Sequence, residues 1–169
     1  NIDFVGKDIN PNEIANFGLL EKIDKWKTSM KSKGEEFLPL VGLHQATCCS
    51  ETKYVGRDDL LLMVLDNGSI ISGCLTKSST PSAPVMWCRK NFKSTLKIRE
   101  PIVILVNAGN ANAFTGKEGD IACQKKATAL SNLFNCNNSN IFFASTGVIG
   151  EILHVQKIIN KLPILKKSL

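Results

Sequence analysis

Residues 102–116 read IVILVNAGNANAFTG, and this stretch decides how the chain around it is organised. The first five residues are apolar and mostly β-branched, which predicts a buried strand. In the residues that follow, three asparagines alternate with small side chains, and the stretch contains two glycines, Gly109 and Gly116. Such residues cannot fill a core, but they satisfy or release backbone groups locally, so we expect a structured loop. The loop follows the carboxyl end of a strand, where α/β proteins usually place their sites.

A helix is expected directly after this loop. Thr115 lies three residues before Glu118, which is the spacing of a capping box at a helix start. The helix would present one apolar face, formed by Cys123, Ala127, Leu130 and Phe134.

Residues 141–144 read IFFA and predict a second buried strand, which ends at a hydroxyl-and-glycine loop. Strand, helix and strand in series predict a βαβ-like unit over residues 102–147, and therefore an α/β fold. If the two strands are parallel neighbours, the loops at 107–116 and 145–150 lie at the same sheet edge. The residues expected in the core are Val103, Leu105, Leu130, Phe134, Ile141 and Phe143.

Upstream, the sequence predicts a β-hairpin and a short helix. Two apolar runs, residues 60–65 and 70–76, flank an Asn-Gly pair at 67–68. Both residues of that pair tolerate the positive φ of a tight hairpin turn. Pro84 at a first helical position favours a short helix over residues 85–92.

Each end of the chain is expected to carry an amphipathic helix. Residues 1–36 form a polar lead-in, and we assign residues 37–169 to the folded domain. The lead-in has apolar residues at helical spacing, namely Leu19, Ile23, Trp26 and Met30. The last helix has its own apolar face, formed by Val155, Ile158, Ile159 and Leu162, and is expected to stop near Pro163.

Composition limits the classes of function. The chain has 169 residues, a formal charge of +6 and 43% hydrophobic residues, which fit one ordinary globular domain. It has only three arginines, so its lysines favour solvated helix faces over a nucleic-acid surface. No apolar run approaches the roughly 18 residues of a membrane span. The chain begins at Asn1 without a methionine, which favours a fragment or a processed piece.

The cysteine pattern argues against a metal site. None of the six cysteines lies in a C-x-x-C pair, and neither histidine has a cysteine nearby in sequence. A reducing intracellular compartment is therefore expected. Three cysteines have small or apolar neighbours and are expected to be buried, namely Cys74, Cys88 and Cys123.

The loop that follows the second strand can support acyl chemistry. The hydroxyl of Thr146 and the backbone N–H of Gly147 can present two donors to one point, as a tetrahedral oxyanion requires. Glycine leaves that N–H unobstructed because it has no Cβ. A plain turn, in which Thr146 bonds its own backbone, is the alternative reading.

Other chemistry has weaker support. The chain contains neither a P-loop motif nor G-x-G-x-x-G, and its serines lack a G-x-S-x-G frame. His44 and His154 have no evident triad partners. Asp58 and Asp59 are expected to be solvated or to cap a turn.

Three blocks resemble the ornithine acetyltransferases, or bifunctional glutamate N-acetyltransferases, of arginine biosynthesis. The first runs from Gly56 to Leu62 and continues at Thr80–Val85 and Cys88. The second block is Val106–Gly116, and the third is Ala144–Glu151. The blocks occur in the family's order and spacing, and the similarity covers about residues 39 to 162.

This resemblance implies a mechanism. Family members are precursors that cut themselves, and the new amino-terminal Thr of the second chain takes an acetyl group from N-acetylornithine. Glutamate then collects the acetyl group in a ping-pong cycle, and some members also use acetyl-CoA as a substrate. Carried over to this chain, Thr146 and Gly147 form the oxyanion hole. The loop asparagines Asn107, Asn110 and Asn112 are supporting candidates.

The resemblance also implies an assembly. The family fold is a layered α-β-β-α sandwich, of which this chain is a part, assembled as α2β2 with a β chain from the same precursor. No cofactor, metal, nucleic acid or membrane is implied, and a cytoplasmic or organellar-matrix location is expected. The nucleophile and the substrate-binding residues are expected beyond Leu169. Separated from that part, the chain would expose apolar surface and dissolve poorly.

The chain departs from the family pattern in two places. Lys77-Ser78-Ser79 stands where an Asn-containing turn is usual, and residues 152–156 replace a proline-bearing segment. One alternative is therefore a truncated, non-catalytic family member that acts as a binding or structural module. Another is an anion- or nucleotide-binding domain that uses the glycine loops and the helix start near Thr115.

Overall fold

The computed structural model describes residues 40–94 and 97–169. The amphipathic helix predicted within residues 1–36 lies outside these ranges, and so does the predicted boundary at residue 36. The elements in chain order are β1 (Leu43–Cys48), β2 (Leu60–Leu65), α3 (Ala83–Phe92), β3 (Ile102–Asn107), α4 (Gly116–Phe134), a 3-10 turn (Asn138–Asn140), β4 (Ile141–Ser145) and α5 (Val155–Lys167).

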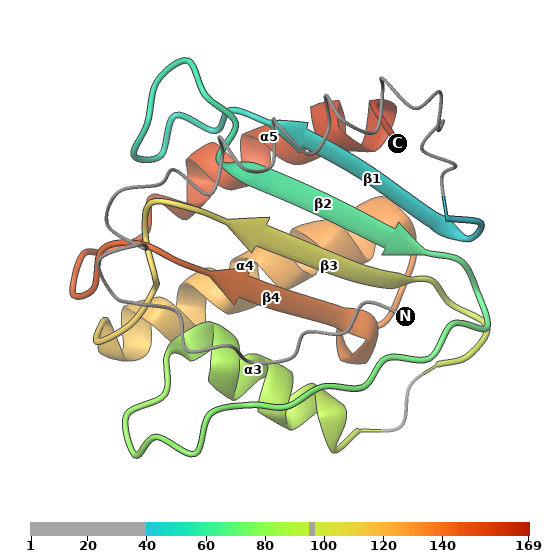
Figure 1. Ribbon diagram of the computed structural model, residues 1–169, viewed down its shortest axis with the longest axis horizontal. Helices are drawn as coiled ribbons and strands as arrows, with labels where there is room; N and C mark the ends of the chain where they lie inside the picture. The colour runs from blue at the N-terminus through green and yellow to red at the C-terminus, as the bar shows by residue number, and fades with distance from the viewer. Residues whose placement is uncertain (1–39, 95–96) are drawn as a thin grey trace, which may run out of the picture. The chain divides into compact units, whose positions relative to one another are not determined.

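The described strands form one mixed sheet in the order β1-β2-β3-β4. The β1–β2 and β2–β3 pairs are antiparallel, whereas β3 and β4 are parallel and are joined by α4. Figure 1 shows α4 and α5 covering one face of this sheet, while α3 lies beside β4. The predicted βαβ unit is therefore confirmed, and the fold is α/β.

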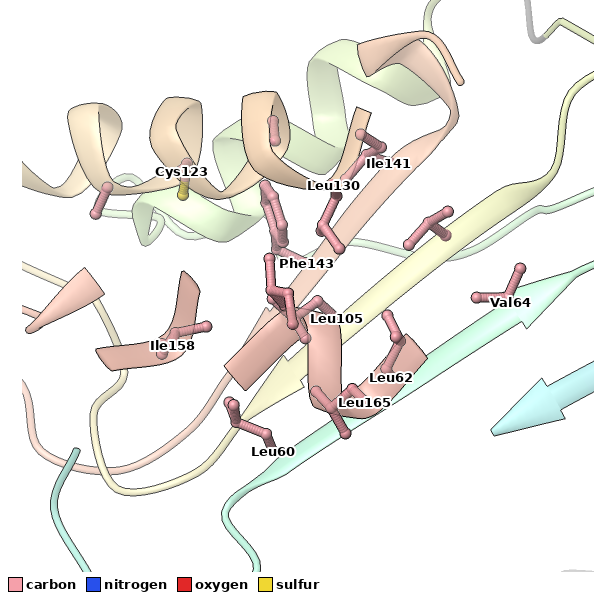
Figure 2. Close-up of a cluster of buried hydrophobic side chains, with 14 of the residues drawn as sticks. Leu60, Leu62, Val64, Leu105, Cys123, Leu130, Ile141, Phe143, Ile158 and Leu165 are labelled. Carbon is pink, nitrogen blue, oxygen red and sulfur yellow. The ribbon is translucent and has the colours of Figure 1, made fainter. Parts of the chain in front are cut away.

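The core fills the space between the sheet and its two covering helices. Strand β2 alternates across the sheet, with Leu60 and Leu62 buried on the helix side and Leu61 and Met63 half-buried on the other. Figure 2 shows the core side chains of the strands, α4 and α5 pointing toward one another. Five of the six predicted core residues are fully buried, namely Val103, Leu105, Leu130, Ile141 and Phe143. Phe134 is only partly buried at the end of α4.

Helix α4 begins where the sequence predicts, but the predicted capping box is wrong. Thr115 is the N-cap residue, yet its side chain makes no cap hydrogen bond. The Thr115 hydroxyl instead donates to Asn112 Oδ1 at 3.1 Å. The loop asparagine thus competes successfully with the helix for this hydroxyl.

The predicted hairpin is also wrong. The strand at 60–65 and the turn at 66–69 both form, with Ser69 N–H donating to the Asp66 carbonyl at 3.2 Å. Residues 70–76 do not form a strand, because β2 already pairs with β1 on one edge and with β3 on the other. Cys74, within this irregular segment, is exposed rather than buried, whereas Cys88 and Cys123 are buried as expected.

The last helix runs past the proline that was expected to end it. Helix α5 continues through Pro163 to Lys167, and Leu165 in the extra turn is fully buried. Burial of that leucine offsets the hydrogen bond that proline cannot donate. Helix α3 begins at Ala83 with Pro84 in its first turn, as the sequence indicates. Among the helices in the described ranges, none has the length and apolar character needed to cross a membrane.

Candidate oxyanion site at the sheet edge

Three connections meet at one edge of the sheet. Because β3 and β4 are parallel and β2 runs the other way, the carboxyl ends of β3 and β4 meet the amino end of β2. We name residues 108–115 the asparagine loop and residues 146–151 the Thr-Gly loop. Helices α4 and α5 begin shortly after these loops, so both place their partially positive amino ends at this edge.

The two loops continue the pairing of β3 and β4 beyond the strands. An isolated parallel bridge joins Asn110 to Val148. Four backbone hydrogen bonds link the segments: Thr146 N to Asn107 O at 3.0 Å, Val148 N to Gly109 O at 3.2 Å, Ala111 N to Val148 O at 2.9 Å and Gly150 N to Ala113 O at 2.9 Å. The predicted shared edge is therefore confirmed, and the two loops form one hydrogen-bonded unit.

Gly147 lies where this pairing is tightest. Its φ is +129°, a conformation that side chains rarely adopt. An ideal Cβ at this position would lie 2.6 Å from both Asn110 N and Gly109 O. Backbone therefore packs directly on backbone, and only glycine fits at position 147.

The three loop asparagines are buried, with exposed fractions of 3% for Asn107, 4% for Asn110 and 0% for Asn112. Their amides bond the polypeptide nearby: Asn107 Nδ2 donates to Asn110 O at 2.9 Å, Asn110 Nδ2 to Glu151 O at 3.0 Å and Asn112 Nδ2 to Gly119 O at 3.1 Å. Asn107 Oδ1 also accepts from Ser145 Oγ at 2.6 Å. These contacts give the asparagines a scaffolding role, because their polar atoms hold the two loops.

Thr146 and Gly147 differ from the asparagines in being exposed. The Thr146 backbone N–H is occupied by Asn107 O. Within residues 40–94 and 97–169, by contrast, neither the Thr146 hydroxyl nor the Gly147 N–H has a hydrogen-bond partner. The plain turn, in which Thr146 bonds its own backbone, is therefore not what the described residues form. Two adjacent donors remain available on a well-held loop, which is an arrangement suited to an oxyanion.

Asp58, Asp59 and His44, which were considered from the sequence, have structural partners. Asp59 is buried and closes the β1–β2 connection by accepting from the Ser50 N–H and hydroxyl. Asp58 accepts from Thr47 Oγ1, and His44 Nε2 lies 3.0 Å from Asp66 Oδ1. His154 immediately precedes α5 without a side-chain cap bond.

Two cysteines near this edge, Cys48 and Cys123, are not activated. Burial raises the pKa of the Cys48 and Cys123 thiols, so both stay protonated near neutral pH. Cys123 Sγ lies 3.5 Å from Asn112 Nδ2, within the support of the asparagine loop. A nucleophile for acyl transfer is therefore not provided by these thiols.

Two depressions flank the loops. One of about 300 Å³ lies at the start of α4 and is lined by Thr80, Pro81, Ala83, Met86, Asn112, Phe114, Thr115, Gly116 and Asp120. Its lining contains the carboxylate of Asp120 and no basic side chain, which disfavours the anion- or nucleotide-binding alternative there. The other, of about 400 Å³, is lined by Thr52, Lys53, Asn110, Glu151, Ile152 and His154.

The polar contacts around the second depression were missed in the sequence analysis. Lys53 Nζ bonds both carboxylate oxygens of Glu151, at 2.9 and 3.2 Å, although the residues lie 98 positions apart. Such a pair has no local pattern. The lysine next to the first resemblance block and the glutamate that ends the third were the available signals.

Comparisons with known proteins point to one family. The model of the ArgJ family matches residues 44–169. Three similar relatives carry the name arginine biosynthesis bifunctional protein ArgJ: that of Nitrobacter winogradskyi is 43% identical over 70% of this chain, that of Gluconobacter oxydans 40% over 77%, and that of Brucella suis 46% over 71%. The chain spans only 28–30% of the length of these relatives.

Two solved structures share the fold. The Bacillus halodurans ArgJ structure has a TM-score of 0.60 and 26% identity, with 71% of this chain and 61% of that chain covered. The Mycobacterium tuberculosis ornithine acetyltransferase, solved with ornithine, has a TM-score of 0.64 and 25% identity, with 76% and 67% covered.

Proposed function

This chain belongs to the ArgJ family, and from that premise we propose that it is part of an acetyltransferase of arginine biosynthesis. The reaction moves an acetyl group from N-acetylornithine to glutamate, with acetyl-CoA as a possible further donor. Thr146 and Gly147 supply the oxyanion hole. The observation that carries this assignment is the pair of adjacent, exposed donors without partners among the described residues, on a loop held by buried asparagines.

The proposed chemistry uses these donors when the acetyl carbonyl is attacked. A nucleophile adds to the carbonyl carbon, and the carbonyl oxygen becomes an oxyanion, to which the Thr146 hydroxyl and the Gly147 N–H donate hydrogen bonds. Collapse of the adduct releases ornithine and leaves an acetyl-enzyme. The glutamate amine then attacks the acetyl-enzyme through a second adduct of the same geometry. Donors already fixed by the loops need little reorganisation at either step.

We assign the nucleophile and the amino-acid contacts to a β chain from the same precursor, in an α2β2 assembly. The half-buried apolar side chains on the sheet face away from α4 and α5, among them Leu61, Met63 and Leu65, support a second covering layer. Such a layer would complete the α-β-β-α sandwich. Ornithine bound to the Mycobacterium tuberculosis relative supports an ornithine derivative as the substrate class.

The test is made on the full reading frame that contains this chain, assayed for acetyl transfer from N-acetylornithine to glutamate. Replacing Thr146 with Ala removes one oxyanion donor, so kcat is expected to fall by roughly 10²–10³ with folding retained. Thr128→Ala is the matched control, because the Thr128 hydroxyl is exposed and bonds only the carbonyl of Gln124 in its own helix.

Three results would count against the proposal. Wild-type turnover by Thr146→Ala would remove the oxyanion role. A folded wild-type protein without acetyl transfer would favour the non-catalytic module, and micromolar ATP binding without acetyl-CoA binding in calorimetry would favour the nucleotide-binding alternative.

A further inference from the structure

The connection between β1 and β2 crosses the loops that carry the oxyanion donors. We name residues 49–59 the strap. Its base is closed by the Ser50–Asp59 hydrogen bonds, and the Asp59 carbonyl accepts from Ala108 N–H at 2.8 Å. The strap is therefore fastened to the first residue of the asparagine loop.

The strap also packs on Gly109. An ideal Cβ on Gly109 would lie 2.7 Å from Lys53 Cβ and 3.0 Å from Tyr54 Cε2. Gly109 is the same residue whose backbone contacts Gly147. Strap, asparagine loop and Thr-Gly loop are thus stacked in van der Waals contact through Gly109.

Lys53 extends from this stack to the far end of the Thr-Gly loop. Its ammonium group bonds both carboxylate oxygens of Glu151. The Glu151 carbonyl is held in turn by Asn110 Nδ2 at 3.0 Å. The loop is therefore anchored before Gly147 by the Thr146 N–H and after it by the Val148 and Gly150 backbone bonds, and Glu151 holds its far end.

We propose that Lys53 and Glu151 are positioning residues, which fix the direction of the Gly147 N–H by clamping the end of the Thr-Gly loop to the strap. This inference rests on the proposed function. The Gly147 N–H has no hydrogen-bond partner among the described residues, so its direction depends on how firmly the loop is held on either side. Neither Lys53 nor Glu151 touches the reacting atoms in this scheme.

Because the Lys53–Glu151 pair is exposed, its effect on catalysis can be measured separately from its effect on folding. The side chains of Lys53 and Glu151 are 40% and 51% exposed. Ion pairs of this kind contribute little to folding stability, because water and salt screen them. Catalysis is more sensitive, because a small misplacement of a reacting or stabilising group lowers the rate steeply. Loss of the pair should therefore reduce the rate and leave the fold intact.

The experiment uses the full-length protein with Lys53→Met, Glu151→Gln, Lys53→Arg and the exchanged pair Lys53→Glu/Glu151→Lys. Lys53→Met and Glu151→Gln are each expected to lower kcat about tenfold, with KM and Tm unchanged. This effect is smaller than that expected for Thr146→Ala, which removes an oxyanion donor. Lys53→Arg keeps the ion pair and should retain most of the rate, and the exchanged pair should recover most of it. Lys166→Met is the matched control, because Lys166 bonds the Leu133 carbonyl away from these loops.

Hydrogen exchange followed by mass spectrometry tests the clamp independently of activity. The amides of Val148 and Gly150 pair with the asparagine loop, so they should exchange faster in Lys53→Met and Glu151→Gln but not in Lys166→Met. Wild-type kcat in Lys53→Met, alongside impaired Thr146→Ala, would overturn the inference and leave the proposed function standing. Unchanged exchange would overturn it as well. A wild-type protein without acetyl transfer would remove the proposed function and the catalytic role of the pair together.

Discussion

Lys126 lies fully buried in the core of the described domain, and its ammonium nitrogen has no hydrogen-bond partner among residues 40–94 and 97–169. Its nitrogen lies 4.5 Å from the centre of the Phe143 ring. Burial lowers the pKa of Lys126, and the thiols of Cys123 and Cys88 oppose this lowering. A cation–π contact offsets only part of the cost of removing an ammonium group from water.

Replacing Lys126 with Met should therefore stabilise the protein, by about 1–4 kcal/mol near neutral pH, as seen when buried charges give way to apolar side chains of similar volume. The gain should also depend on pH. At a pH between the lowered pKa of Lys126 in the folded protein and its unfolded value of about 10.4, Lys126 is protonated only in the unfolded chain. The unfolded chain then binds more protons, so the free energy of unfolding of the wild type rises with pH relative to that of the variant. The difference between the two proteins should thus shrink as pH increases.

Urea unfolding of both proteins from pH 6 to 8 measures this difference. Burial also raises the pKa of the Cys88, Cys123 and Cys136 thiols, which lowers stability above the unfolded thiol pKa. The Cys136 contribution is common to both proteins, but Lys126 also lowers the pKa of Cys88 and Cys123. The two proteins are therefore compared below about pH 8, where the thiols are protonated in both states. A variant less stable than the wild type would show that the lysine has an unrecognised partner.

At the scale of the elements, local patterns predicted the parts whose partners are near in sequence. The period of apolar residues identified β3, α4 and β4 as a βαβ-like unit, and the structure pairs its two strands in parallel. The Asn-Gly turn formed as predicted, but its hairpin did not, because a local signal does not reveal that β1 and β3 occupy both edges of β2. Gly147 could be singled out because it follows Thr146 at the end of a predicted strand. The Lys53–Glu151 ion pair joins residues far apart in the sequence, so it was missed.

The proline inside α5 gives a prediction at the same scale. Pro163 is exposed and cannot donate to the Ile159 carbonyl, its partner in a regular helix. Pro163→Ala should restore that bond without loss of packing. Inside a helix, Ala is more favourable than Pro by about 3 kcal/mol. Removing Pro also gives the unfolded chain more conformational freedom, which lowers the gain in stability by about 1 kcal/mol. A net increase of about 1–2 kcal/mol in the free energy of unfolding is therefore expected.

Thermal and urea unfolding of Pro163→Ala, monitored by circular dichroism, measure this gain. Ile164→Ala is a suitable control, because Ile164 is 52% exposed on the same turn and its replacement leaves the backbone donors unchanged. A loss of stability in Pro163→Ala would mean that the last turn of α5, with Leu165 in the core, requires the geometry imposed by proline.

At the scale of the whole molecule, the two faces of the sheet are covered to different extents. Helices α4 and α5 close one face. On the other face Ile102 and Phe142 are buried in a smaller cluster, whereas Leu61 and Met63 on β2 are only half-buried. Near the loops, Phe114 is 71% and Ile149 is 62% exposed. Apolar surface of this kind marks an interaction site, and the proposed second layer of the sandwich is its expected partner.

Met63 provides the test of this partner. Expressed alone, the chain should self-associate and bind a hydrophobic dye, and Met63→Lys should reduce both effects because it places a charge in the middle of the apolar face. In the full-length protein the same change should impair assembly, because the lysine would have to be buried without a partner. Light scattering, dye fluorescence and size-exclusion chromatography measure these outcomes. Met86→Lys, on α3 with Met86 46% exposed, should leave assembly intact. Normal assembly of Met63→Lys would show that this sheet face stays open to solvent, and the second layer would then have to attach elsewhere.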